Sequence, residues 1–236
     1  MIEVKDLFKK FGKNEVLKGI DLTIERGGIF SVLGPNGSGK TTLIKCILGM
    51  VLPDAGQISI DGKPLKNNFK YRNEIDYLPQ IANFPGNLKV SELIDMIKDL
   101  RDAKATKDEE LIELFKLQPF LNKKLSNLSG GTKQKVNLVL TFMFDSPLII
   151  LDEPTNGLDP ISHLRLKNLI NTEKEKGKTI LITSHILSFV EEISDEIVFL
   201  LEGKIYFKGS ITELKTKTEQ PDFEHAIASI LSSSYA

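Results

Sequence analysis

The feature that most constrains this chain is a glycine-rich stretch between an apolar run, residues 29–33, and a helix-like run, residues 42–50. The stretch reads Gly34, Pro35, Asn36, Gly37, Ser38, Gly39, Lys40 and Thr41. It fits the phosphate-binding loop pattern of glycine, any four residues and Gly-Lys-Thr, in the strand-to-helix context that this pattern requires. The alternative, a glycine-rich turn with a chance lysine, needs every one of these positions to agree by accident.

The residue types of this loop suit a nucleotide polyphosphate. Glycines let successive backbone N–H groups point at the anion, and the helix N-terminus that follows adds its free amides and partial positive charge. Lys40 can bridge the terminal phosphates, the Thr41 hydroxyl can ligate Mg²⁺, and Thr42 belongs to the same first turn. The loop therefore predicts ATP or a similar nucleotide with Mg²⁺ as cofactors.

The charge balance of the chain argues against nucleic acid as a partner. Its 236 residues carry 31 basic and 32 acidic side chains, a net charge of −1. We find no apolar run of the roughly 18 residues that a membrane span needs, and no signal-peptide pattern. The single cysteine, Cys46, lies among apolar residues and is predicted to be buried. A cytoplasmic chain that does not enter a membrane by itself is expected.

Strand and helix patterns predict an α/β fold. Alternating residues indicate antiparallel strands at 2–4, 16–24 and 57–60, and apolar runs indicate buried strands at 148–151, 179–183 and 197–201. Helical spacing appears from Ser91, a candidate cap, and over 108–117, 161–176 and 186–194. Strands that alternate with helices predict a mostly parallel sheet. The expected organisation is one domain, residues 1–215, with a helical subdomain at about 84–145, and a short helical tail, residues 216–236.

Two carboxylates end the buried strand at 148–151. Ligands of parallel sheets bind beyond the carboxyl ends of the strands, which places Asp152 and Glu153 at the edge where the phosphate loop lies. Asp152 suits Mg²⁺ through its water shell, and Glu153 could polarise an attacking water. The alternative is that both acids merely cap the following turn.

A second glycine pair follows Ser129. Ser129, Gly130, Gly131 and Thr132 precede a helix-like segment that runs to about Phe144. By composition Ser129 is an ordinary N-cap, yet the segment also forms a second anion-ready helix N-terminus. Two such sites in one chain suggest that two copies clamp one nucleotide between them.

With these motifs in place, the chain resembles the ATP-binding subunit of an ABC transporter over residues 1–215. In the terms of that family, residues 34–41 are the Walker A loop, 148–153 the Walker B strand, Gln80 the Q-loop, 129–132 the signature, 157–159 the D-loop and His185 the switch histidine. Thr132 stands where many members have glutamine, a variation that exporter-type subunits share.

The resemblance implies ATP hydrolysis in a head-to-tail dimer with a second copy. Ser129, Gly130 and Gly131 would act on the ATP held by the other copy, and Asp159 would connect the two sites. His185 would contact the γ-phosphate and take part in catalysis with Glu153. Gln80 would join Thr41 and Asp152 at Mg²⁺, and Phe11 would stack on adenine, although Phe8 is a close competitor.

The resemblance also implies a membrane partner. Residues 78–101 lie where family members dock an integral membrane permease, so the chain is expected on the inner face of the membrane in an exporter-like system. The sequence of residues 79–88 resembles the corresponding stretch in the ATPase of the nitrous-oxide-reductase copper-site maturation system. That system also has a periplasmic accessory protein, which would be a further partner. Two alternatives remain: a soluble ABC-type ATPase, and a scaffold without turnover, which Glu153 and His185 disfavour.

Overall fold

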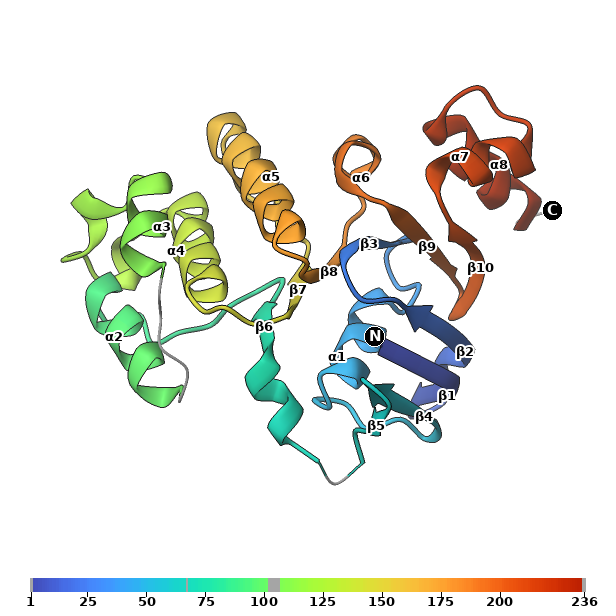
Figure 1. The fold of residues 1–236 in the computed structure, drawn as a ribbon, viewed down its shortest axis with the longest axis horizontal. Helices are drawn as coiled ribbons and strands as arrows, with labels where there is room; N and C mark the ends of the chain where they lie inside the picture. The colour runs from blue at the N-terminus through green and yellow to red at the C-terminus, as the bar shows by residue number, and fades with distance from the viewer. Residues whose placement is uncertain (1, 67, 102–106, 235–236) are drawn as a thin grey trace. The chain divides into compact units, whose positions relative to one another are not determined.

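The computed structural model describes residues 2–66, 68–101 and 107–234. Its chain divides into two units, described separately: residues 1–69 with 179–236, and residues 70–178. Figure 1 labels the helices and strands of both units and colours them along the sequence, from blue at the N-terminus to red at the C-terminus. The predicted bounds at 215 and at 84–145 stay predictions, and residues 1, 67, 102–106 and 235–236 of the predicted domains lie outside the described part.

The first unit holds an antiparallel sheet. Its strands are β1 (Ile2–Phe11), β2 (Asn14–Ile24), β4 (Ala55–Ile60) and β5 (Lys63–Pro64), in the order β2-β1-β4-β5. β1 is longer than the predicted strand at 2–4 because a bulge interrupts its alternation. The register shifts between Val4 and Leu7, where Asp6 has a φ of 47°.

The same unit holds parallel strands that carry the phosphate loop. β3 (Gly28–Leu33) pairs in parallel with β8 (Thr179–Thr183) and with β9 (Glu196–Leu201), and β9 pairs antiparallel with β10 (Lys204–Gly209). Every residue of β8 is buried, which explains its unbroken apolar character. Cys46, on helix α1 (Lys40–Ile47), is buried as predicted. Helix α6 (Leu187–Ile193) follows β8.

Two helices end the chain. They are α7 (Ile211–Thr218) and α8 (Phe223–Ser234), and they contact each other. Ser210 caps α7: its hydroxyl accepts from the Glu213 N–H, and the Glu213 carboxylate accepts from the Ser210 N–H. Among the described residues, every helix is too short or too polar to span a bilayer.

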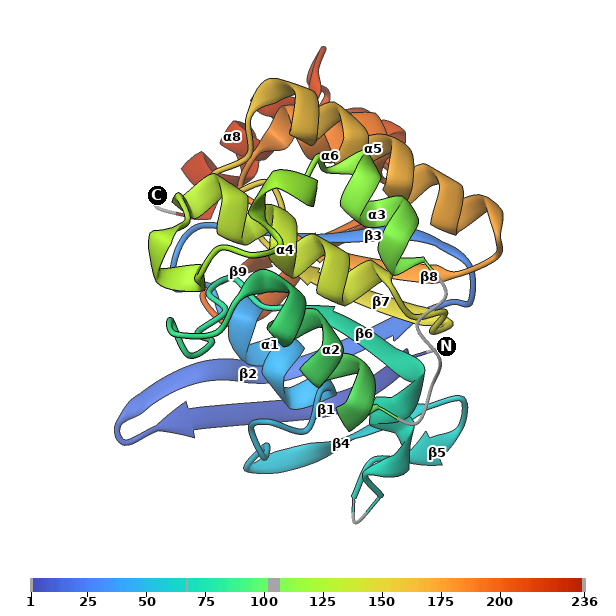
Figure 2. The same cartoon turned by 90° about the vertical axis from the view of Figure 1, so that its left-hand side faces the viewer.

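The second unit combines a pair of strands with a group of helices. β6 (Ile75–Leu78) pairs in parallel with β7 (Leu148–Asp152), and helix α5 (Pro160–Glu175) follows β7. Helices α2 (Val90–Leu100) and α3 (Asp108–Leu114) both contact α4 (Gly130–Phe142), as Figure 2 shows. Short 3-10 turns at Lys70–Glu74, Gln118–Phe120 and Leu125–Asn127 complete the unit.

Two helix ends in this unit differ from the prediction. Ser91 is not the cap of α2, because the helix already begins after Lys89, whose N–H donates to the Glu92 carboxylate at 2.8 Å. Helix α3 stops at Leu114 rather than at 117, because Lys116 has a φ of 54°, a left-handed value that ends a helix.

Candidate nucleotide site

The phosphate loop connects β3 to α1 with a backbone that requires glycine. Gly34, Gly37 and Gly39 have φ values of 150°, 82° and 108°. A Cβ on Gly34 would lie 2.0 Å from the carbonyl oxygen of Leu200, so a side chain is excluded there by contact as well as by conformation. The loop therefore has the shape that its sequence pattern predicts.

The polar groups of the loop fit a bound phosphate chain. Lys40 is only 7% exposed, and its ammonium donates to the carbonyl oxygens of Gly34 at 2.7 Å and Pro35 at 3.1 Å, which keeps it inside the loop. The Ser38 hydroxyl is buried and makes no hydrogen bond within the described residues. A buried hydroxyl without a hydrogen bond costs free energy unless a ligand such as an anion can bond to it. Thr41 and Thr42 follow in the first turn of α1.

His185 lies at the same sheet edge as this loop. β3 and β8 are parallel neighbours with Val32 beside Thr183, so the residues that follow both strands leave at their carboxyl ends. His185 is exposed, and the neighbouring Ser184 hydroxyl accepts from the Ile186 N–H at 3.1 Å. The first unit thus brings the loop and the predicted switch histidine to one edge.

The predicted adenine platform is exposed on the first unit. Phe11, at the end of β1, is 51% exposed, and Phe8 is 39% exposed. The Lys9 ammonium lies 5.3 Å from the centre of the Phe11 ring. Because both rings are exposed, exposure does not decide which of them stacks on adenine, and the choice of Phe11 over Phe8 stays a prediction.

The second unit brings the predicted acids and Gln80 to one edge. β6 and β7 are parallel with Leu78 beside Leu151, so Gln80 and the Asp152-Glu153 pair follow the strands at the same end. Asp152 and Glu153 are 1% and 4% exposed. Burial, and to a smaller extent the nearby Asp152 charge, raises the pKa of Tyr77 to about 12.

Glu153 has an unusual backbone. Its φ is 51°, in the left-handed region that residues other than glycine rarely adopt. Such strain concentrates at functional sites, where the surrounding structure holds a residue in one orientation. β7 ends at Asp152, immediately before this residue.

The signature segment begins α4 as the sequence predicts. The Ser129 hydroxyl accepts from the Thr132 N–H at 3.3 Å and caps the helix. A Cβ on Gly131 would lie 2.5 Å from the Gly157 carbonyl oxygen, whereas one on Gly130 would meet nothing within 4 Å. The start of α4 therefore packs directly against the D-loop of its own chain.

Two residues that sequence reasoning missed fix this contact. Gln134 donates from its side-chain amide to the Pro154 carbonyl oxygen at 3.1 Å, and Lys135 forms an ion pair with Asp159 at 2.6 Å. The sequence alone assigned no role to either residue. The sequence places both residues on the predicted helix after Ser129, but it does not show which residues of that helix face residues 154–159.

Asp159, which is predicted to connect the two ATP sites of a dimer, is the N-cap of α5. Its carboxylate accepts from the Ser162 N–H at 2.9 Å and from the Ser162 hydroxyl at 2.8 Å. Lys135 and these Ser162 donors hold the pKa of Asp159 well below its usual range, so the group stays ionised. The described residues hold no cluster of three or more His, Cys, Asp or Glu side chains that could bind a metal alone.

Comparisons with known proteins agree with this geometry. A family model described as "ABC transporter" matches residues 17–156, and a model for an AAA domain matches residues 122–191. The ABC transporter ATP-binding protein YtrB of Bacillus subtilis is 36% identical over 91% of this chain and 74% of that protein. The bacitracin transport ATP-binding protein BcrA of Bacillus licheniformis is 34% identical over 93% and 73%.

A lantibiotic transport protein and two solved structures extend the similarity. The lantibiotic transport ATP-binding protein SrtF of Streptococcus pyogenes is 32% identical over 87% of this chain and 89% of that protein. A structure described as an ATP-binding subunit of an ABC transporter superposes with a TM-score of 0.89 at 31% identity, over 97% and 98% of the two chains. A dimeric bacterial ABC transporter cassette gives 0.80 at 25% identity, over 89% and 98%. The expected α/β phosphate-loop fold is confirmed.

Proposed function

The chain belongs to the ABC transporter family as an ATP-binding subunit with ATPase activity, and we propose that it powers a separate membrane permease through a head-to-tail dimer of two copies. The observation that carries the proposal is the phosphate loop, with the buried Lys40 ammonium and Ser38 hydroxyl inside it. A groove on the second unit, described below, supports the permease as the partner.

Each site residue has a defined task in ATP hydrolysis. Lys40 exchanges its loop carbonyls for phosphate oxygens, and the loop N–H groups bind the same anion. Thr41, Asp152 and Gln80 would hold Mg²⁺ together with phosphate oxygens, and the bound ion would supply positive charge at the phosphates. Glu153 orients the attacking water and accepts its proton, and His185 contacts the terminal phosphate. The burial of Glu153 strengthens these electrostatic interactions.

The second copy of the chain completes each site in this proposal. Ser129, Gly130 and Gly131 lie at the N-terminus of the long helix α4, whose free amides suit the phosphates of the ATP held by the partner copy. Asp159, at the N-terminus of α5, would link the two sites. Capping of both helices already fixes these segments within one chain.

A groove on the second unit supports the permease as partner. The groove has a volume of about 200 Å³, and its apolar lining includes Tyr77, Pro79, Ala82, Phe84, Ile97 and Phe144. Ile81, between two lining residues, is 74% exposed. The groove falls within and beside the predicted docking segment 78–101, and an apolar surface of this kind suits a short helix of a membrane partner.

The name of one relative favours export as the direction of transport. This relative, 32% identical, is named for Nod factor export, and two others are named for bacitracin and lantibiotic transport. We therefore propose an exporter-like system, with this chain bound to the permease at the inner membrane face. The narrower assignment to copper-site maturation of nitrous oxide reductase, with its periplasmic accessory protein, stays a prediction.

Copurification tests the proposal. The tagged chain is expressed in its native cell, the membranes are solubilised gently, and copurifying proteins are identified by mass spectrometry. An integral membrane protein in near-equal amount is the expected result, and its identity defines the branch. Ribosomal or DNA-repair partners without a membrane protein would replace the proposal with the soluble ATPase.

A matched pair of variants assigns the surface. Ile81→Asp places a charge beside the groove and should release the membrane protein. Leu52→Asp, at a side chain of similar exposure, 76% against 74%, lies in the first unit and should keep it. Equal loss from both variants would contradict the groove as the docking site.

A further inference from the structure

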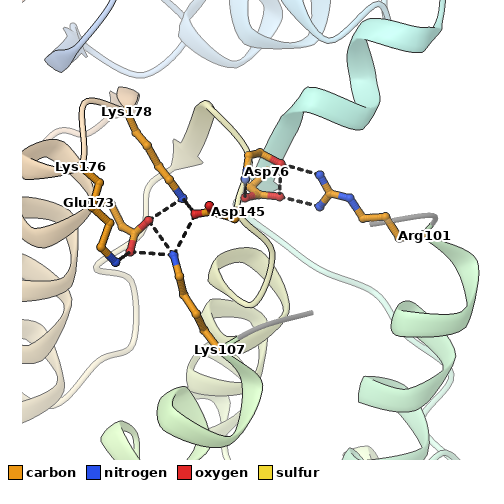
Figure 3. A network of polar contacts seen from close by, with 8 residues as sticks. Asp76, Arg101, Lys107, Asp145, Glu173, Lys176 and Lys178 are labelled. Carbon is orange, nitrogen blue, oxygen red and sulfur yellow. Dashed lines mark hydrogen bonds and ion pairs between the residues drawn. The ribbon is translucent and has the colours of Figure 1, made fainter. Parts of the chain in front are cut away.

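We propose that Arg101 is a positioning residue for Gln80, because it anchors the short strand β6 through Asp76, and that it links the docking groove to this predicted Mg²⁺ ligand. The inference rests on the proposed function for the role of Gln80 and for the groove. It concerns the side chains drawn in Figure 3, all of which belong to the second unit.

Arg101 contacts β6 and the turn before it at several points. It follows the last residue of α2, and its guanidinium forms an ion pair with Asp76, the second residue of β6. The same group donates to the backbone carbonyl of Asn73 at 3.0 Å and to the Ser146 hydroxyl at 2.6 Å. A planar guanidinium can hold such a set of acceptors in fixed directions, which a lysine ammonium cannot.

Asp76 is a buried acceptor that depends on these donors. Its carboxylate has no exposed surface and also accepts from the Ser146 hydroxyl at 2.9 Å and the Ser146 N–H at 3.3 Å. Burial raises the pKa of Asp76, while Arg101 and Ser146 act in the opposite direction. Removal of the guanidinium would leave this buried carboxylate with the Ser146 donors alone, which costs free energy.

β6 needs such an anchor because it is short and paired on one side. It has four residues, and among the described strands it pairs with β7 and stands last in the strand order. A strand of this length forms few ladder hydrogen bonds, so the contacts that Arg101 makes are a large share of its polar attachments. Gln80 follows two residues after β6 ends, and its position depends on where the strand is held.

Arg101 belongs to the groove as well as to this anchor. Both Arg101 and Asp76 line the groove, and the guanidinium stacks 4.3 Å from the centre of the Phe144 ring. A partner seated in the groove would therefore contact the group that holds β6. A displacement of Arg101 would change its hydrogen bonds to Asp76, on the strand that leads to Gln80, and to Asn73, on the turn before that strand.

A neighbouring ion-pair group supplies the matched control. Lys107 contacts Glu173 at 3.0 Å and Asp145 at 3.2 Å, on α5 and on the turn before β7, and neither partner lies on β6 (Figure 3). Lys107 and Arg101 are equally shielded, with 16% and 19% of their side chains exposed, and each has a fully buried carboxylate partner. Glu173 keeps Lys176 and Lys178 when Lys107 is removed.

The first test is hydrogen exchange on the full chain without nucleotide. We expect Arg101→Met to speed exchange in peptides that cover residues 75–84 by about tenfold, because the strand opens more often. Lys107→Met should leave these peptides unchanged. Arg101→Lys, which keeps the charge and loses the planar fork, should fall between the two. Equal exchange in Arg101→Met and wild type would overturn the inference, and if Arg101→Met fails to fold, Arg101→Lys alone decides it.

The second test separates this inference from the function on which it rests. Orienting groups around a metal typically change metal affinity by about tenfold or more. We expect Gln80→Ala and Arg101→Met both to raise the Mg²⁺ concentration for half-maximal ATPase activity about tenfold, with Lys107→Met unchanged. A shift in Gln80→Ala without one in Arg101→Met would overturn the positioning role. No shift in Gln80→Ala would instead overturn the Gln80 assignment.

Discussion

At the scale of single residues, backbone contacts and backbone conformation explain why particular residue types occupy positions in the functional loops. Gly130 and Gly131 are neighbours at the start of α4, yet only Gly131 lies against another backbone, the Gly157 carbonyl. Glu153 has a left-handed backbone, with a φ of 51°. The functional loops are therefore defined by sterics as well as by the chemistry of their side chains.

The glycine pair gives a stability prediction. Gly131→Ala should lower the free energy of unfolding by about 2 kcal/mol, because its Cβ would collide with backbone that cannot rotate away. Gly130→Ala should be neutral or slightly stabilising, since its Cβ meets open space and alanine favours helices. Urea unfolding of both variants checks this, and equal stability would contradict the contact.

Glu153 gives a prediction on turnover. Glu153→Gln should slow ATP hydrolysis by about 10²–10⁴, because the amide cannot accept the proton of the water, while ATP affinity stays within a few fold. Glu202→Gln is the control, since Glu202 is an exposed glutamate with a similar φ of 48°. Wild-type turnover in Glu153→Gln would remove Glu153 from the catalytic role.

At the scale of elements, ion pairs attach helices to the strands beside them. Glu173 on α5 is buried, which raises its pKa, but Lys176, Lys178 and Lys107 lower the pKa overall. Lys178 and Lys107 also lower the pKa of Asp145 to about 2. Because both carboxyl groups have lower pKa values in the folded chain, their stabilisation is present above the unfolded pKa of about 4 and is lost toward pH 2.

This sign gives a prediction on acid unfolding. The urea midpoint should fall as the pH drops from about 4 to 2, and Asp145→Asn should make this fall less steep. Asp95→Asn, at an exposed carboxylate on α2, serves as the control and should follow wild type. An Asp145→Asn profile parallel to wild type would mean that this ion-pair group does not contribute to acid sensitivity.

At the scale of the whole molecule, the proposed dimer assigns motifs of one chain to two different ATP molecules. Lys40 and Glu153 would serve the ATP of their own chain, and Ser129 that of the partner. This division predicts which inactive chains can restore one another. It does not depend on the permease, so purified chains suffice to examine it.

Mixing inactive variants checks this division. A mixture of Lys40→Ala and Ser129→Arg chains should recover part of the wild-type ATPase activity, because a mixed dimer contains one intact composite site. A mixture of Lys40→Ala and Glu153→Gln chains should remain inactive, because each variant spoils the site of its own chain. Equal behaviour of the two mixtures would contradict the head-to-tail arrangement.

The sequence predicted this fold and the candidate loops well where chemistry is local. A few adjacent residues determine the phosphate loop, the Ser129 cap and the acids at the end of β7, so each can be predicted from the local sequence. The pair of Arg101 and Asp76 joins residues 25 positions apart, and polar side chains of this kind carry no periodic signal. The bulge at Asp6 likewise concealed most of β1.

The buried Cys46 makes the chain convenient for site-directed labelling. Burial raises the pKa of its thiol to about 11, so almost none of it is the reactive thiolate at neutral pH. Because the sequence contains no other cysteine, a thiol introduced on the surface would be the one that reacts with a maleimide dye or spin label. Pairs of probes could then report distances in the working transporter without first replacing a native residue.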